Sequence, residues 1–145
     1  MRRGLAAVGL GVAALTSVGV AAPQVTTLLA TGTTWDGTPL AYPAGAARVT
    51  AMKIRLEEGD AVAFHCHPVP TFGYVLEGSI RVRLKSGRER LFHQGEALAE
   101  VVNTLHKGVP VGGPVEFVVF YAGASGMEVS LAADDPRCRE QPPGS

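Results

Sequence analysis

Two histidines one residue apart are the clearest sign of chemistry in this sequence. His65 and His67 flank Cys66 within residues 61–67, which we predict to form a β-strand. Because side chains alternate along a strand, both imidazoles would lie on one face, close enough to bind one metal ion. Cys66 would point to the opposite face and is not expected to be a ligand. A pair of surface histidines is the alternative, and this spacing alone leaves both open.

The strands that must position the pair follow from short apolar runs separated by glycine and proline. Ile80, Val82 and Leu84 alternate with charged side chains, which predicts one dry and one wet face. We predict strands over residues 48–56, 61–67, 72–76, 79–85, 89–92, 97–102 and 115–121. About eight short strands without helices between them indicate an all-β, antiparallel sandwich or barrel. A parallel α/β fold is excluded, because it needs long crossover segments.

Both ends of the chain are expected to lie outside the barrel. Residues 1–22 combine two early arginines, an uncharged apolar run and small residues, which predicts a signal peptide that is cleaved on export to the periplasm or the medium. A retained membrane anchor is disfavoured, because the run is short and rich in Gly and Ala. After cleavage no stable membrane span would remain. Residues 23–125 would form the single domain, and residues 126–145 an edge strand and a flexible tail.

Charge and cysteine content limit the possible binding partners and raise the question of a disulfide. Thirteen basic and thirteen acidic side chains give a formal net charge of zero. Without a basic excess, nucleic acid is not an expected partner. Cys66 and Cys138 could form a disulfide in an oxidising compartment, or remain separate thiols, and the sequence leaves both open.

Two spaced patterns surround the histidines. Gly59, His65, His67 and Gly78 stand at the spacing of G-x5-H-x-H-x3,4-E-x6-G. Gly95 and His106 match G-x5-P-x-G-x2-H-x3-N, while Val101, Asn103 and Pro110 occupy its slots for Pro, Gly and Asn. These are the two motifs of the cupin family, which residues 59–110 therefore resemble.

The resemblance implies a single antiparallel jelly-roll barrel with a divalent metal bound inside it. By position, His65, His67 and His106 would be the ligands. Three imidazoles accept iron, manganese, zinc, nickel or copper, so the sequence does not identify the metal. The family also implies a small-molecule ligand and suggests a homodimer.

The family's glutamate ligand is missing, since its slot holds Thr71, a poor ligand for a divalent ion. Glu100 is the best substitute, because an ionised side chain on that strand needs a partner or a metal. The alternative is that Glu100 faces solvent or an arginine. Asn103 could hydrogen-bond the ligand shell, and Tyr74 could meet a substrate. Glu77 and His93 are expected at the surface, and Phe72 and Phe120 in the core.

Three functions follow from the resemblance. The first is an oxygenase-type enzyme that oxidises a diketone, an aromatic diol or a thiol at the metal. The second is a module that binds a metal or small molecule without catalysis, which the loss of the glutamate favours. The third is a metal-free barrel whose histidines form a hydrogen-bonded cluster. A fold alone does not select among them.

Overall fold

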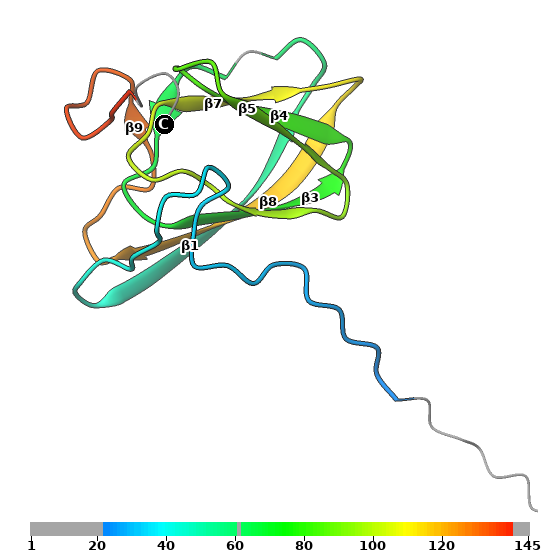
Figure 1. Cartoon of the computed structure of the whole chain (residues 1–145), viewed down its shortest axis with the longest axis horizontal. Helices are drawn as coiled ribbons and strands as arrows, with labels where there is room; N and C mark the ends of the chain where they lie inside the picture. Colours follow the sequence, from blue (N-terminus) through cyan, green and yellow to red (C-terminus); the bar gives the residue numbers. More distant parts are fainter. Residues whose placement is uncertain (1–21, 61, 141–145) are drawn as a thin grey trace, which may run out of the picture.

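Two antiparallel β-sheets face each other in the computed structural model, which describes residues 22–60 and 62–140. Figure 1 shows the sheets enclosing the interior of the domain. One sheet has the order β1-β8-β3-β6 and the other the order β5-β4-β7-β2-β9. The strands are β1 (Ala47–Leu56), β2 (His65–Cys66), β3 (Thr71–Glu77), β4 (Ser79–Leu84), β5 (Glu89–His93), β6 (Ala97–Ala99), β7 (His106–Pro110), β8 (Val115–Ala124) and β9 (Leu131–Ala132). The predicted all-β, jelly-roll architecture is confirmed.

Alternation along β4 explains how the sheets bury a common core. Ile80, Val82 and Leu84 are at most 5% exposed. The charged side chains between them face water, where Arg81 and Arg83 pair with Glu89 of β5. The strand therefore follows the period-two pattern predicted for it.

The predicted strand over residues 61–67 was too long. Only His65 and Cys66 form ladder pairs there, with β7 on one side and β9 on the other. Pro68 and Pro70 lack the N–H that would continue the ladder. The segment is held instead by irregular contacts on both sides.

Two further strand predictions need correction. Residues 97–102 form a strand only to Ala99, and β7 was missed altogether. The β7 sequence HKGVP contains Gly and Pro and has little strand propensity of its own. It becomes a strand because it pairs along its whole length with β4.

The C-terminal segment is attached rather than loose up to Arg139. Cys138 forms a disulfide with Cys66, with 5.6 Å between their Cα atoms. Arg139 also exchanges backbone hydrogen bonds with Asn103 and Leu105. The segment predicted to form a flexible tail is thus linked to distant parts of the chain up to Arg139, and such links are invisible in local composition.

The expected core positions of Phe72 and Phe120 are also wrong. The two residues are opposite each other in the β3–β8 ladder, and Phe120 is 47% exposed. Thr71, Gly73 and Val75 of β3 line the interior, so the residues between them face outward. The buried clusters consist of other residues, namely Val75, Ile80, Val82, Phe92, Leu98 and Val115 in one and Val69, Val119 and Tyr121 in the other.

The described N-terminal segment starts at Ala22, outside the body of the domain, and leads in an extended path to the sheets (Figure 1). Trp35 then packs against the first buried cluster, and its backbone N–H donates to the carbonyl of Ala99. Apart from Ala22, the predicted signal peptide lies outside the described residues. Within the described ranges, no helix is long and apolar enough to cross a membrane.

Candidate metal centre

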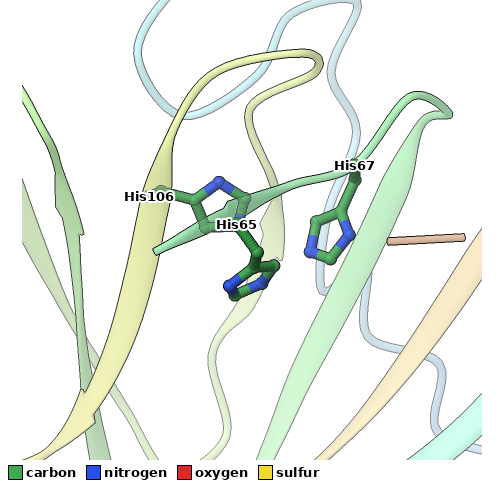
Figure 2. Close-up of side chains that lie close together, drawn as sticks. All are labelled: His65, His67 and His106. Atoms are coloured by element: carbon green, nitrogen blue, oxygen red, sulfur yellow. The ribbon is translucent and has the colours of Figure 1, made fainter. Parts of the chain in front are cut away.

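Three imidazoles converge between the two sheets. His65 of β2 is directly opposite His106 of β7 in the ladder, and His67 follows two residues after His65. Their candidate ligand atoms all lie within 4.8 Å of one another. Figure 2 shows the three rings gathered in one place from these two segments. The predicted same-face arrangement of His65 and His67 is confirmed.

Backbone carbonyls fix the orientation of all three rings. The Nδ1 atom of His65 lies 2.9 Å from the oxygen of Ala63. The Nδ1 atoms of His67 and His106 each lie 2.8 Å from a carbonyl oxygen, of Val129 and Thr104 respectively. A carbonyl can only accept, so each Nδ1 carries the proton in the neutral ring. Each Nε2 therefore keeps its lone pair, which is the state that a metal ligand needs.

Burial keeps two of the rings neutral. His67 and His106 are 6% and 2% exposed. Burial and the nearby His106 and His65 lower the pKa of His67 to about 3. Burial, followed by the effect of His65, lowers the pKa of His106 to about 4. At neutral pH both rings are therefore lone-pair donors, so protons hardly compete with a metal for them.

A cavity of about 140 Å³ adjoins the histidines. Its walls are largely apolar, and they come from β1, β3, β4, β6, β7 and β8. Besides the histidines, its polar side chains are those of Thr71 and Glu100. A small, mostly apolar molecule that can form one or two hydrogen bonds matches such walls.

Thr71 and Glu100 both line the cavity, from neighbouring strands. The Thr71 hydroxyl donates to the carbonyl of Val69 at 2.9 Å. Oε1 of Glu100 accepts hydrogen bonds from Nε1 of Trp35 at 2.8 Å and from the N–H of Val101 at 2.9 Å. Burial raises the pKa of Glu100. Glu100 therefore faces neither solvent nor an arginine.

The other expected site residues lie elsewhere. The Asn103 N–H donates to the carbonyl of His67 at 2.8 Å, but its buried Oδ1 has no partner among the described residues. Asn103 thus supports the backbone of a candidate ligand rather than a ring. Tyr74 pairs with Val118 on the outer face of its sheet, away from the cavity. His93 and Glu77 are exposed, as predicted.

Sequence reasoning missed Trp35, Tyr121 and Val129. Trp35 is 65 positions from Glu100, and Val129 is 62 from His67, so no local pattern could join them. The ring of Tyr121 packs edge-on against His67, with 5.3 Å between ring centroids. Its place in the run VEFVVFY indicated a strand but not which residue would meet the histidines.

Comparison with known proteins gives a family. Residues 52–121 match the family model described as Cupin domain. The protein contains a cupin domain. The match includes all three histidines and Glu100, but it begins after Trp35.

Solved structures agree with the cupin fold at low identity. An RmlC-like cupin family protein from Methanocaldococcus jannaschii has a TM-score of 0.50 and 16% identity, over 55% of this chain and 74% of that one. Bacillus subtilis oxalate decarboxylase, whose Mn(II) centres have been described, has a TM-score of 0.50 and 16% identity, over 59% of this chain and 24% of that one. DMSP lyase DddQ from Ruegeria pomeroyi has a TM-score of 0.52 and 18% identity, over 67% and 47%.

The cupin domain thus spans only about a quarter of the oxalate decarboxylase chain and about half of the lyase. At this identity the likeness concerns the fold. No curated protein matches the chain.

Proposed function

We propose that this cupin-domain protein binds one divalent transition-metal ion through Nε2 of His65, His67 and His106. The observation that carries the proposal is the set of three Nδ1–carbonyl hydrogen bonds, which leave a lone pair on each Nε2 of three rings whose candidate ligand atoms lie within 4.8 Å of one another. An apolar histidine cluster without a metal would have no need of three rings fixed in this tautomer.

We further propose that the metal serves an oxygenase-type reaction on a small molecule. A bound ion with three protein ligands would supply open positions for substrate and dioxygen. The protein's own contribution is to orient the molecule against apolar walls and to exclude water. A cavity of about 150 Å³ accommodates benzene in another protein, so the 140 Å³ measured here suits a single aromatic ring. Among the three substrate classes implied by the family, an aromatic diol therefore fits best.

Oxalate fits less well as a substrate. The proposed ion would neutralise its two negative charges, but such a fully polar molecule would gain little from the largely apolar walls. The carboxylate of Glu100 suits a hydroxyl group that can donate a hydrogen bond.

Metal binding is tested by titrating chelator-treated protein with Fe(II) under anaerobic conditions and with Zn(II), in competition with a chromophoric chelator. We expect one ion per chain, and loss of binding by at least about a hundredfold in His67→Ala. His93→Ala is the matched control, because His93 is exposed and contacts Ser79 at the surface. Binding that survives His67→Ala would contradict the proposal.

Catalysis is tested by oxygen uptake of the iron-bound protein with a catechol, a β-diketone and a thiol. We expect uptake with the catechol that is lost in His106→Ala. A non-catalytic binding module is the second candidate, favoured by Thr71 in the glutamate slot. Calorimetric binding of the catechol to the metal-bound protein without oxygen uptake would support the module and contradict the enzyme.

We also propose that the protein works after export. The disulfide between Cys66 and Cys138 supports this, since such bonds persist in oxidising compartments. The apolar run within residues 1–22 also supports it, since such runs are typical of export signals. A homodimer is supported by β1, a ten-residue edge strand on which Val49 is 66% exposed.

A further inference from the structure

The place of the missing family glutamate is next to Glu100. The backbone N–H of Glu100 donates to the carbonyl of Thr71 at 2.8 Å, which places the two residues side by side at the ends of β3 and β6. Both side chains line the cavity that the histidines share. A carboxylate is thus present on the neighbouring strand, in the same interior layer as the family's slot.

Thr71 is not free to take the role itself. Thr71 is 2% exposed, and its hydroxyl donates to the carbonyl of Val69. A neutral hydroxyl with its proton committed elsewhere is a weak ligand for a divalent ion. At this edge of the cavity, the carboxylate of Glu100 is therefore the better partner for a metal ion.

Two donors hold that carboxylate by one oxygen. Nε1 of Trp35 and the N–H of Val101 both donate to Oε1 of Glu100. Among the described residues, Oε2 has no hydrogen-bond partner within the protein. Glu100 is 8% exposed and lines the cavity. Oε2 is not among the fully buried, unpartnered atoms of the described residues, so a cation or water in the cavity can reach it.

Glu100 and the three histidines line the same cavity. Glu100 interacts electrostatically with both His67 and His65. It does not belong to the set of ligand atoms that lie within 4.8 Å of one another. A water molecule that bridges Oε2 and the ion would join the two without direct ligation.

We propose that Glu100, clamped by Trp35 and placed one strand away from the family's glutamate slot, supplies the carboxylate of the metal centre through a metal-bound water. The inference rests on the proposed function, because it assumes an ion at the three histidines. Trp35 is a positioning residue in this arrangement. It lies before the part of the chain that matches the family model.

Metal preference provides the test. Manganese favours oxygen ligands, whereas zinc binds well to imidazoles alone. Glu100→Gln keeps the shape of the side chain and an oxygen for the two clamping donors, but removes the charge. We expect this variant to bind Mn(II) about 10–100-fold more weakly, as loss of an indirect carboxylate partner does elsewhere, and Zn(II) less than about tenfold more weakly.

A second variant, in which the carboxylate is placed at the family's position, tests the role of the charge. Adding Thr71→Glu to Glu100→Gln returns the charge to the family's slot, and we expect this double variant to regain most of the Mn(II) affinity. Trp35→Phe removes the clamping N–H and is expected to lose less Mn(II) affinity than Glu100→Gln. Glu77→Gln is the matched control, because Glu77 is an exposed carboxylate whose ion pair with Arg55 lies outside the cavity.

The outcomes separate the two proposals. If the wild-type protein binds neither metal, both fail. If it binds both metals and Glu100→Gln leaves the Mn(II) affinity unchanged, only the role of Glu100 is refuted. Equal losses for both metals, with no recovery in the double variant, would show a structural role and would also refute it.

Discussion

Two regions of this molecule are stabilised in different ways. The hairpin region, residues 71–93, consists of β3, β4 and β5, which are joined by tight turns. β4 and β5 pair with each other, whereas β3 belongs to the other sheet and pairs with β8 and β6. The histidine region, residues 62–70, 103–106 and 129–139, contains two two-residue strands and the start of β7. It is held by a disulfide, by an isolated bridge between Thr104 and Arg139, and by side-chain bonds to carbonyls.

The difference separates scaffold from site. Regular ladders satisfy backbone groups by pairing, so they need few specific side chains. In the histidine region, carbonyls that a longer ladder would use are instead available to orient imidazoles. That region therefore depends on a few long-range links, and removing one should affect metal binding before it affects the hairpins.

The largest effect is expected from the disulfide. Cys138→Ser opens a link between residues 72 apart in sequence and leaves Cys66 in its buried position. For a loop of this length we expect a loss of about 4 kcal/mol in the free energy of unfolding, measured by urea denaturation. Metal affinity should fall as well, because Cys66 lies between two of the histidines. Unchanged metal affinity would show that the site does not need this link.

The next effect is expected at the turn between β3 and β4. Gly78 has φ of 77°, and a Cβ atom there would lie 2.2 Å from the carbonyl oxygen of Pro114. We expect Gly78→Ala to cost at least about 3 kcal/mol, from left-handed strain and a backbone clash together. Gly87→Ala is the control, since its φ is also positive but nothing lies within 4 Å. It should cost only about 1 kcal/mol.

Metal titration of Gly78→Ala without a chelator tests whether the hairpin region and the histidine region are independent. The fraction of Gly78→Ala that remains folded should bind metal with wild-type affinity, because the turn makes no contact with the histidines. A large loss of affinity in that variant would mean that the two regions are coupled more tightly than their contacts indicate.

Acid provides a further test, on the metal-free protein. The pKa of His67 is lowered to about 3 and that of His106 to about 4, against 6.5 for an ordinary histidine. Between pH 6.5 and 4 the unfolded chain binds protons that the folded chain does not. Stability is therefore full above pH 6.5 and falls as the pH falls, by about 1.4 kcal/mol per histidine per pH unit.

Denaturation with urea between pH 4.5 and 8, in the presence of a chelator, measures this slope. The raised pKa of Glu100 acts in the opposite direction, so Glu100→Gln should steepen the slope. His106→Gln should reduce the slope by the contribution of one histidine, about 1.4 kcal/mol per pH unit. A flat profile in the wild-type protein would contradict the neutral, buried state of the rings.

The sequence predicted the hairpin region well and the histidine region in part. Alternation in β4 indicated its dry and wet faces, because that strand is long enough to show a period. Outside this region, the apolar run of β8 indicated a strand but not its faces, since Phe120 was expected in the core and is exposed. β7 escaped prediction, since it becomes a strand only through its partner β4. His65 and His67 could be placed on one face by spacing, whereas the position of His106 followed only from its place in a family motif.

The contacts around the histidines could not be predicted. Glu100 was recognisable as an unusual charge on an apolar strand. Its clamp by Trp35 joins segments far apart in the chain, as does the bond from His67 to Val129. Long-range pairs of this kind leave no periodic trace in one sequence, and neither did the pairing of Cys66 with Cys138.

Anomalous X-ray scattering from crystals of the zinc-bound protein tests the central claim most directly. The account predicts one strong zinc peak about 2.0–2.1 Å from Nε2 of His65, His67 and His106, with every Nδ1 still facing its carbonyl. A peak elsewhere, at His93 for example, or no peak between the three rings, would contradict it.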